Sequence, residues 1–595
     1  MNGTVSDHLL QRLREWGVSR VYGFPGDGID GIMGALNRSK KGPVFVQSRH
    51  EEGAAFMAAA HAKFTGQVGV CMATSGPGAI HLLNGLYDAK LDHASVVAIV
   101  GQQRSVSLGA DFQQEVDLLS LFKDVANEYV HMACSPSQIT HLVDSAFRIA
   151  MADHVVTCLI IPADVQEMDA PSGIPRLHGY TASGVGYEYP LIIPKEKQID
   201  EAARALNRGS KVAILVGAGA LGCTEEVMQI AELLGAGVAK ALLGKCVLSD
   251  DLPYCTGSIG LLGTKPSWNL MMNCDTLFMI GSGFPYSEFL PKPGSAVGIQ
   301  IDINPRMLNL RYPMTFLLHG DAKATLGEII PRLKQKTELD WRKSIEDDVG
   351  EWWEILHARA MREADPINPQ RLFWDLSRKL PDDVILTNDS GSSTNWFARD
   401  IKVKPTMKSS LSGGLATMCP AVPYAIAAKF AYPDRPVVAI TGDGAAQMLG
   451  MAEMITVAKY YKTWNDPRLI IIVVNNQDLN QVTWEQRVLA GDPKFIASQE
   501  IPDVRFADYA RLLGLEGVDL TSPKDIDQAL DQAFASRIPF VINAYCDPEV
   551  PPLPPHITFE QAKNFLSAIY HGDEGGLHLI KTSVAQMMGS WLPHE

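Results

Sequence analysis

The sequence has no C-x-x-C pair, no apolar run as long as a membrane span and no excess of basic residues. Its nine cysteines are scattered and odd in number, which predicts reduced thiols and argues against a disulfide framework. With 52 basic and 67 acidic residues the formal charge is −15, which argues against a general nucleic-acid or anionic-membrane surface. We therefore expect a small-molecule enzyme with no nucleic-acid partner.

The N-terminal segment, MNGTVSDHLLQRLREWGV, is amphipathic and mixed in charge, and it lacks the pattern of a signal peptide. The apolar runs elsewhere are too short to span a bilayer. These features predict a cytoplasmic protein, or at most a peripheral membrane protein.

At 595 residues the chain is too long for a single core, and three or four domains are expected. Short apolar strands alternate with helix-length segments, which predicts an α/β fold with three doubly wound parallel-sheet domains. We expect a linker at 172–192, where proline and glycine interrupt a polar stretch, and a connecting helix in the charged stretch 334–370. The predicted domains cover 1–185, 192–335 and 365–547, followed by a helical tail at 548–595.

Two strands near the C-terminal end are predicted to hold a magnesium diphosphate. The strand 437–440 runs into Gly-Asp-Gly, and after a helix the strand 469–474 ends in Asn-Asn. Both strand ends lie where open α/β sheets bind ligands, and glycine at a helix start lets the backbone approach phosphate. Carboxylate, amide and main-chain oxygens are the hard ligands that Mg²⁺ prefers. The assigned residues are Asp443, Asn476 and the main chain near Asp478 for the metal, with Gly442, Gly444 and Ala445 for the phosphates.

This GDG-helix-strand-NN pattern resembles the thiamine diphosphate signature of enzymes that decarboxylate 2-keto acids. The alternative is an ordinary crossover with a polar loop. Near the N-terminus, RHEEGAAFMAAAHA, TSGPGAIHLLNGLYDA and DFQQE resemble the pyrimidine-binding domain of pyruvate oxidases and acetohydroxyacid synthases. By this resemblance Gly26, Asp27 and Gly76 belong to the cofactor site.

The same resemblance gives Glu51 a catalytic role. In the family a carboxyl group in an apolar site hydrogen-bonds the aminopyrimidine ring and favours its imino form. The cofactor then deprotonates its own thiazolium carbon, and burial keeps the carboxyl partly protonated for this task. The alternative for Glu51 and Glu52 is a solvated first helical turn.

The middle domain contains an incomplete dinucleotide fingerprint. The strand 212–216 leads into GAGALG, which satisfies G-x-G-x-x-G, but the next strand is followed by AKALLGK and not by an acidic residue. Further on, GSIGLLGTKPSWNLMMNCDTLFMIGSGFPYSEF and IQIDINP resemble the flavin-binding domain of the pyruvate oxidases, including the quinone-reducing kind. The resemblance implies an FAD site at Gly217, Gly219, Gly260, Gly263, Gly281, Ser282, Phe284, Asp302 and Asp321. Leu243 stands where flavin-binding relatives carry arginine, and the alternative is a middle domain that keeps its fold without flavin.

The substrate side both matches and departs from the oxidases. Met418 falls where the family places a bulky apolar residue that bends the cofactor, although a lone methionine is also typical of a core. Glu485 matches a family glutamate over the reactive carbon, whereas Gln481 replaces an aromatic side chain. Phe112 and Gln113 agree with the oxidases, but the usual histidine-proline pair after them is Val-Asp here. The cofactor chemistry is unaffected by these departures, and the second half-reaction stays open.

The tail begins with PPLPPHITFEQAKNF, which also resembles the quinone-reducing oxidase. Beyond it, apolar residues recur at helical spacing, at Leu577, Ile580, Val584, Met587 and Trp591. The polar side of this helix offers one lysine, which favours docking on the protein's own body over a weak membrane-surface contact.

The sequence therefore predicts a pyruvate oxidase-type enzyme that uses thiamine diphosphate, Mg²⁺ and FAD. It would decarboxylate a 2-keto acid, with pyruvate the first choice, and pass two electrons from the enamine to flavin and on to a quinone or oxygen. The alternatives are acetolactate-type carboligation with a non-redox flavin, non-oxidative decarboxylation, and a non-catalytic cofactor-binding protein. In the family the cofactor lies between domains of two subunits, which implies a homodimer or homotetramer.

Overall fold

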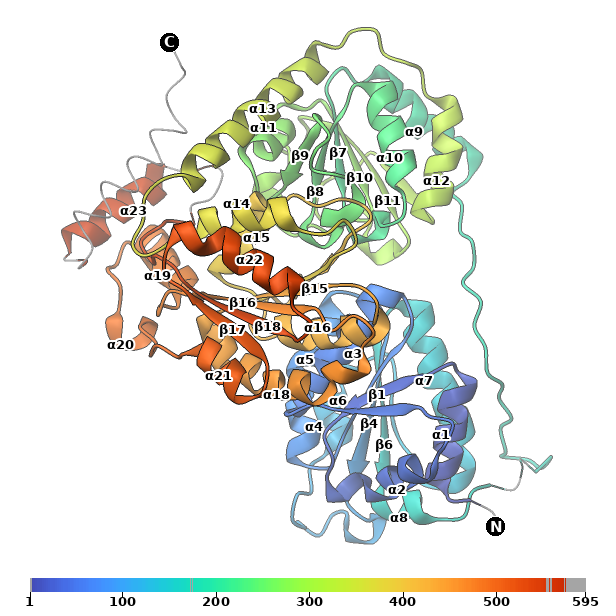
Figure 1. Ribbon diagram of the computed structural model, residues 1–595. Helices are drawn as coiled ribbons and strands as arrows, with labels where there is room; N and C mark the ends of the chain where they lie inside the picture. The colour runs from blue at the N-terminus through green and yellow to red at the C-terminus, as the bar shows by residue number, and fades with distance from the viewer. Residues whose placement is uncertain are drawn as a thin grey trace.

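The computed structural model describes residues 3–171, 173, 175–552, 556, 559–571 and 573. Within this part of the chain there are three six-stranded sheets, whose paired strands are parallel. In Figure 1 the N-terminal sheet lies at the bottom, the middle sheet at the top, and the C-terminal sheet to the left between them. The predicted class of three parallel α/β domains is confirmed.

Each sheet is built from one continuous stretch of the chain. In spatial order, the N-terminal sheet contains β2 (Val44–Gln47), β1 (Arg20–Gly23), β3 (Gly69–Ala73), β4 (Val96–Gln102), β6 (Val156–Pro162) and β5 (Val130–Met132). The middle sheet contains β12 (Phe316–His319), β11 (Val297–Asp302), β10 (Thr276–Ile280), β7 (Val212–Val216), β8 (Gly237–Lys240) and β9 (Cys255–Ser258). The C-terminal sheet contains β14 (Lys408–Ser410), β13 (Ile385–Asn388), β15 (Val437–Gly442), β16 (Leu469–Asn475), β18 (Phe540–Tyr545) and β17 (Glu516–Leu520).

The N-terminal and C-terminal sheets share one topology. Numbered within each sheet, both have the order 2-1-3-4-6-5, in which the winding reverses between the first and third strands. The middle sheet has the order 6-5-4-1-2-3 and reverses between β7 and β10. Ligands of open α/β sheets bind at such reversal points, outside the carboxyl ends of the strands. The topology therefore marks one candidate crevice on each sheet.

The helices pack around these sheets. The N-terminal domain has α1 (Val5–Glu15), α2 (Asp30–Arg38), α3 (Glu51–Thr65), α4 (Pro77–His81), α5 (Leu83–Leu91), α6 (Leu118–Phe122), α7 (Ile139–Asp153) and α8 (Ala163–Glu167). The middle domain has α9 (Glu196–Arg208), α10 (Thr224–Leu234), α11 (Lys265–Asn273) and α12 (Ala322–Ile329), and α13 (Asp340–Ala360) follows it. The C-terminal part has α14 (Pro369–Lys379), α15 (Ser392–Asp400), α16 (Ala421–Ala431), α17 (Asp443–Ala445), α18 (Met451–Tyr460), α19 (Asn480–Glu485), α20 (Ile496–Gln499), α21 (Phe506–Leu512), α22 (Ile526–Ala535) and α23 (Phe559–Tyr570).

Two alanine-rich helices join the N-terminal and C-terminal domains. Twelve of the 15 residues of α3 are buried, as are nine of the 11 residues of α16, and the two helices pack against each other. Small side chains on both allow this close approach. One continuous apolar core runs from Val46 and Phe56 of the first domain to Tyr424 and Ile471 of the third. These two domains are therefore one packed unit within the chain.

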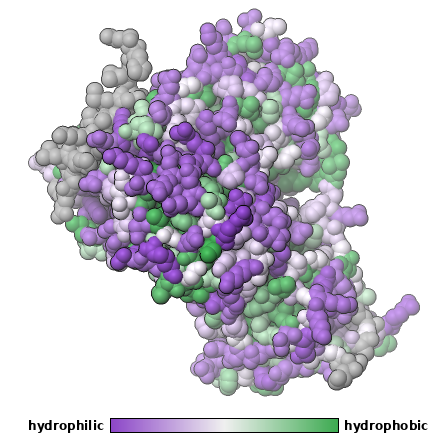
Figure 2. Space-filling view, in the orientation of Figure 1, coloured by the Kyte–Doolittle hydropathy of each residue, from purple (hydrophilic) through white to green (hydrophobic). Residues whose placement is uncertain are grey.

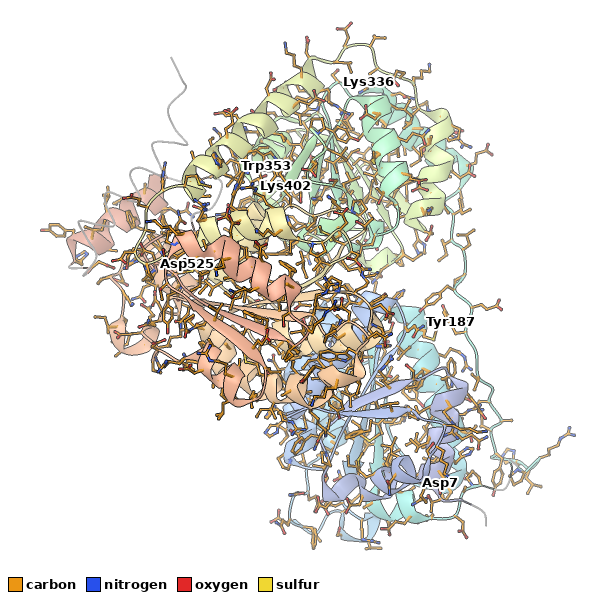
Figure 3. The ribbon with its side chains drawn as sticks, in the orientation of Figure 1. Asp7, Tyr187, Lys336, Trp353, Lys402 and Asp525 are labelled. Carbon is orange, nitrogen blue, oxygen red and sulfur yellow. The ribbon has the colours of Figure 1, made fainter. Side chains whose placement is uncertain are left out.

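The connections between domains agree with the sequence pattern. The described residues of 173–192 contain no helix or strand, and Figure 1 shows this segment running along the outside of the molecule to the middle domain. The predicted connecting helix is α13. The Nζ of Lys402 lies 4.3 Å from the ring centroid of Trp353 on α13, so α13 also contacts the C-terminal domain (Figure 3).

Helix α3 begins at Glu51, because the His50 ring accepts a hydrogen bond from the N–H of Glu52 (3.2 Å) and so caps the helix. In the tail, α23 is present, whereas the predicted apolar stripe from Leu577 onward lies outside the described residues. No helix in the described part of the chain is long and apolar enough to cross a membrane. The face in Figure 2 is mostly hydrophilic, with hydrophobic groups scattered over it.

Candidate active site

The reversal point of the C-terminal sheet is occupied by Asp443. Its Oδ2 accepts hydrogen bonds from the N–H groups of Asn476 (2.9 Å) and Gln477 (2.6 Å), and its Oδ1 accepts one from Gly444 (2.9 Å). These bonds bring the two predicted strand ends together. Burial raises the pKa of Asp443 to about 7, and the groups that oppose this shift are main-chain N–H groups and no cation. A divalent cation at this position would supply the missing positive charge.

The neighbouring carboxylate is already compensated. Asp478 Oδ1 lies 3.2 Å from Lys494 Nζ and accepts a hydrogen bond from the Thr483 hydroxyl (2.9 Å). The side chain of Asp478 is therefore turned to its own loop, which leaves its main chain as the group that could meet a metal. Asn476 Oδ1 accepts a bond from the N–H of Asp478 (3.2 Å), which orders the turn between the two.

Space for a phosphate group exists beside Asp443. A Cβ added to Gly442 would meet no atom within 4 Å, so this backbone is open to a ligand. A Cβ on Gly444 would lie 2.8 Å from Leu479 Cδ2 and 3.3 Å from Met418 Cε. Met418 is only partly buried and packs beside the start of α17, so the predicted thiazolium loop and the predicted metal site are adjacent. The donor set and the space fit a magnesium diphosphate.

Sequence reasoning did not identify Asp389, which follows β13 at the same edge. Its Oδ2 accepts a bond from the Thr441 hydroxyl (2.5 Å) and its Oδ1 one from the N–H of Ala421 (2.9 Å). Burial raises the pKa of Asp389 to about 7. The residue fastens the end of the Met418 loop to the strand that carries Asp443. A buried strand ending in an acidic residue next to Ser-Gly was the available signal.

Glu51 lies on the N-terminal domain, buried at the first turn of α3. Its Oε2 is 3.0 Å from His81 Nδ1, and a Cβ on Gly78 would lie 3.1 Å from its Oε1. The neighbouring Glu52 accepts a bond from Asn84 (2.6 Å), whose amide also donates to Thr417 Oγ1 (3.1 Å). Within one chain, Asn84 thus bridges Glu52, next to Glu51, and Thr417, next to Met418.

The other predicted residues of the N-terminal domain lie around the same edge. Gly76 has φ +61°, and a Cβ on it would lie 2.8 Å from Gln114 Cβ, so the glycine turn carries the loop with Phe112 and Gln113. Both of these side chains are exposed on this chain. Gly26 is packed against Thr74, whose hydroxyl lies 3.4 Å from Asp27 Oδ1. The two glycine turns, at Gly26 and Gly76, therefore lie together at the reversal point of the N-terminal sheet.

On the C-terminal domain, Gln481 joins two polar side chains. Its Oε1 accepts a bond from Asn395 Nδ2 (2.8 Å), and its Nε2 donates to Glu485 Oε1 (2.9 Å). Asn395 was not identified from sequence, because a buried asparagine in the middle of a helix carries no motif. The amide of Gln481 therefore fixes the predicted Glu485 from one side.

The predicted flavin glycines have a packing role of their own. The N–H of Gly219 donates to the carbonyl of Gly281 (3.0 Å), and a Cβ on Gly217 would lie 2.4 Å from that same carbonyl oxygen. A Cβ on Gly244 would lie 2.6 Å from Gly217 C. The carbonyl of Gly263 accepts a hydrogen bond from Nε of Arg399 (3.0 Å) in the C-terminal domain. Glycine at these turns is explained by the crossing of three loops at the reversal point of the middle sheet.

The polar residues of the predicted flavin site also bond within the chain. Asp302 caps the N–H of Asn304 (2.8 Å), and burial raises its pKa. Asp321 is the N-cap of α12 and accepts a bond from Ala324 N–H (2.8 Å). Ser282 Oγ accepts one from the N–H of Phe284 (3.3 Å), and the Phe284 ring lies against Gly260. Leu243 packs against the Gly413 turn of the C-terminal domain, where a Cβ would come within 2.6 Å of its Cδ1.

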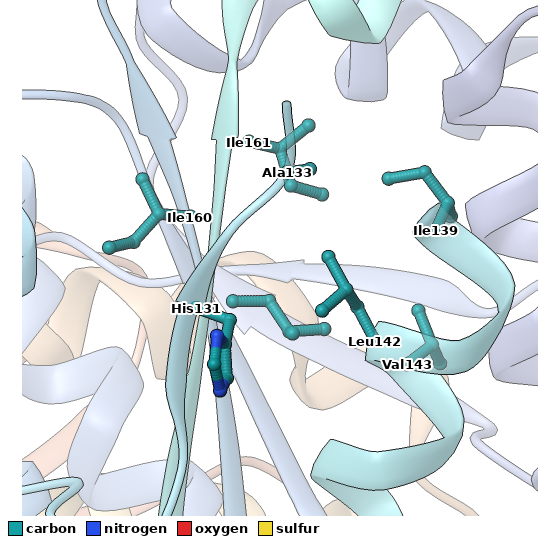
Figure 4. A pocket seen from close by; sticks show the side chains of 8 residues that line it. His131, Ala133, Ile139, Leu142, Val143, Ile160 and Ile161 are labelled. Atoms are coloured by element: carbon teal, nitrogen blue, oxygen red, sulfur yellow. The ribbon is translucent and has the colours of Figure 1, made fainter. Parts of the chain in front are cut away.

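A small apolar cavity lies elsewhere, between β5, β6 and α7 (Figure 4). It is lined by aliphatic residues such as Leu142 and Ile160, with His131 as the one titratable side chain. It contains none of the predicted site residues. With so few polar groups to orient a ligand, it is a packing defect of the core.

The chain matches models of known protein families in three ranges. Residues 3–121 match the thiamine pyrophosphate enzyme N-terminal TPP binding domain, 199–329 the central domain, and 389–544 the C-terminal TPP binding domain. A Bacillus subtilis protein with the name "Putative thiamine pyrophosphate-containing protein YdaP" is 34% identical over 564 residues, 94% of this chain and 95% of its own length. Pyruvate oxidase of Lactiplantibacillus plantarum is 28% identical, with 90% and 87% covered. The large subunit of Escherichia coli acetolactate synthase isozyme 2 is 30% identical, with 93% and 98% covered.

Proposed function

This chain belongs to the thiamine pyrophosphate enzyme family, and we propose that it decarboxylates a 2-keto acid, with pyruvate the first choice, and transfers the released electrons to FAD. The bound thiamine diphosphate would supply the carbon centre that accepts the electrons of the broken bond. The chain itself would hold the diphosphate, activate the pyrimidine ring and order the substrate side.

The observation that carries the proposal is the buried Asp443 at a sheet reversal point. It accepts hydrogen bonds from three main-chain N–H groups, forms no ion pair with a described lysine or arginine, and lies beside open space at Gly442. Asp443, Asn476 and the main chain of Asp478 would hold Mg²⁺, while Gly442, Gly444 and Ala445 would contact the phosphates. Met418 beside Gly444 supports its proposed role under the thiazolium ring.

The flavin assignment is supported by exposed apolar side chains at one edge of the middle sheet. Leu261, Tyr286 and Ile303 follow β9, β10 and β11, and each is more than 40% exposed at the edge where the flavin would bind. Exposed apolar side chains at a crevice suit a large, flat ligand. The proposed FAD residues are those named from the sequence, with Leu243 as a departure that removes one charge.

A homodimer or homotetramer is part of the proposal. Phe112, Ile80 and Met448 are large apolar side chains that are 43–65% exposed on this chain, near the glycine turn and the metal site. A second copy would cover them. Contact with a quinone or with a membrane surface through the tail remains a proposal that rests on the resemblance alone.

Carboligation of the acetolactate type is the second candidate. Gln481 and Asn395 make the substrate side polar where the oxidases carry an aromatic ring. A polar wall suits a second carbonyl compound, and the identity to acetolactate synthases is similar to that to pyruvate oxidase.

One experiment separates the two candidates. Purified protein reconstituted with thiamine diphosphate, Mg²⁺ and FAD is mixed with pyruvate under anaerobic conditions. We expect the yellow flavin absorbance to bleach and to return when a quinone or oxygen is added. Steady release of carbon dioxide with an oxidised flavin, together with acetolactate, would reject the oxidase proposal. Protein that cannot take up FAD would reject the flavin site.

A further inference from the structure

The two carboxylate oxygens of Glu51 face different surroundings. Oε1 lies over the glycine turn, 3.1 Å from the position of a Cβ on Gly78, and has no hydrogen-bond partner among the described residues. Oε2 lies 3.0 Å from Nδ1 of His81. Under the proposed function, Oε1 is the oxygen left free for the pyrimidine ring, and Oε2 already has a proton-carrying neighbour.

His81 connects this buried group to the outside of the chain. The Glu51 side chain is 9% exposed, whereas the His81 side chain is 44% exposed. Water therefore reaches the imidazole much more readily than the carboxyl group. Histidine is also the side chain whose charge changes most readily near neutral pH, because its ordinary pKa is about 6.5. Its two ring nitrogens lie on opposite sides of the ring, so one can accept a proton while the other releases one.

His50, the second histidine near Glu51, cannot take this role. The His50 ring lies beside the His81 ring, tilted by 32° with centroids 4.4 Å apart, but its Nδ1 accepts the hydrogen bond of the Glu52 N–H. This bond fixes Nδ1 of His50 as an acceptor and keeps the ring in its capping position. Glu52, the other charged group here, is held by Asn84 and lies 3.9 Å from His50. Among the described residues, His81 is the one titratable side chain hydrogen-bonded to Glu51.

We propose that His81 is the relay through which Glu51 exchanges its proton with water during turnover. The inference rests on the proposed function, in which Glu51 takes a proton from the pyrimidine ring and returns it. In the outward direction, Oε2 of the protonated carboxyl group gives its proton to Nδ1 of neutral His81, and Nε2 releases its own proton to water. In the inward direction, Nε2 takes a proton from water and Nδ1 returns one to the carboxylate, so no net charge accumulates.

The test measures how fast the thiazolium C2 proton of bound thiamine diphosphate exchanges for deuterium, by rapid acid quench and NMR. The variants are Glu51→Gln, His81→Ala and His81→Asn, with His178→Ala on the exposed linker as the control. Asparagine keeps an N–H donor for Oε2 but cannot carry a proton, which separates transfer from positioning. Each protein is measured with and without added imidazole.

We expect both His81 variants to exchange at least about tenfold more slowly than wild type at equal cofactor saturation. Imidazole should restore the rate of His81→Ala in proportion to its concentration, and it should not affect Glu51→Gln or His178→Ala. Wild-type exchange in either His81 variant would overturn the relay. If exchange in His81→Ala is slow and imidazole does not restore it, while His81→Asn exchanges as wild type, His81 has a positioning role only. This result would also overturn the relay. Wild-type exchange in Glu51→Gln would instead reject the proposed function itself.

Discussion

Glu453 Oε1 accepts a hydrogen bond from the main-chain N–H of Arg49 at 2.9 Å, across the boundary between the C-terminal and N-terminal domains. Glu453 lies on α18, soon after the Gly-Asp-Gly turn, and Arg49 lies two residues before Glu51. The fit is close, because a Cβ on Gly53 would come within 2.4 Å of the same Oε1. At the end of α18, about two turns after Glu453, the Tyr460 hydroxyl accepts a bond from the N–H of Gln47 (2.9 Å). Helix α18 thus holds residues 47–49 in place, and these residues lead directly to Glu51 of the same chain, the proposed proton-transfer acid.

This contact predicts a difference between two substitutions of Glu453. Burial raises the pKa of Glu453 to about 7, so near neutral pH a large share of this side chain is uncharged. Glu453→Gln keeps the Oε1 acceptor and the volume, and we expect near-wild-type turnover. Glu453→Ala leaves the Arg49 N–H without a partner, and we expect a loss of stability of ~1–3 kcal/mol and roughly tenfold slower turnover. Equal activity of the two variants, measured by steady-state kinetics and thermal unfolding, would show that the contact does not position Glu51.

Asp443 should control metal-dependent cofactor binding. Asp443→Asn keeps the shape of the side chain but removes the carboxylate charge that no described cation balances. We expect thiamine diphosphate to bind at least about tenfold more weakly at a fixed Mg²⁺ concentration, since hard divalent cations depend on carboxylate charge. The matched control is Asp478→Asn, whose side chain is turned to Lys494 and which should bind the cofactor more nearly as wild type. Titration calorimetry gives both values, and equal affinity in wild type and Asp443→Asn would reject the metal assignment.

Mixing two inactive variants tests whether the site is shared between subunits. If Glu51 of one chain serves the cofactor held by Asp443 of another, a dimer of one Glu51→Gln chain and one Asp443→Asn chain has one intact site. Random reassembly of equal amounts should then recover about a quarter of wild-type activity, from half the dimers with one working site each. No recovery after confirmed subunit exchange would place both residues of a site on the same chain.

A buried ion pair in the N-terminal domain predicts acid sensitivity. Arg12 donates to both oxygens of Asp144 (2.8 and 2.6 Å), and Trp16 Nε1 donates to Oδ1 (2.8 Å). Burial alone would raise the pKa of Asp144, but the hydrogen bonds from Arg12, Ser183 and Trp16 outweigh it and lower the pKa below its ordinary value of 3.8. The lowered pKa stabilises the fold fully above about pH 4, and this contribution is lost as the pH falls further.

We therefore expect Asp144→Asn to destabilise the fold by ~1–3 kcal/mol at neutral pH, because Arg12 loses its buried carboxylate partner and keeps only the more exposed Glu15. The difference from wild type should shrink below about pH 4. Thermal unfolding across a pH series measures it. Arg38→Gln, which breaks the exposed pair with Asp7, is the control and should change stability little. A pH-independent difference for Asp144→Asn would contradict the assignment.

The sequence predicted the fold well because each strand has a local signature. The run LIIIVVN gives β16, which is buried along its whole length, and the alanine-rich segment after RHEE gives helix α3. The site was predicted where a motif is contiguous, as in GDG and RHEE. It was not predicted where tertiary packing creates the contacts, as for Asp389 and Glu453, because nothing local marks a carboxylate that will bond a distant N–H. The family and fold are confirmed by the comparisons, whereas the domain limits and the residue roles stay predictions.

We expect Gln481 to influence which of the two proposed second half-reactions takes place. Its amide joins Asn395 and Glu485 through two hydrogen bonds, at 2.8 and 2.9 Å, and so keeps this wall polar. Gln481→Phe restores the ring of the oxidases and removes both bonds, each with a net value of ~1 kcal/mol. If polarity admits a second carbonyl compound, acetolactate formed per flavin reduced should fall roughly tenfold. Gln481→Met removes the same bonds without adding a ring and is the matched control. A similar fall in both variants would assign the effect to polarity. A fall in Gln481→Phe alone would assign it to the shape of the ring. Unchanged product ratios in both variants would show that Gln481 does not affect the choice of acceptor.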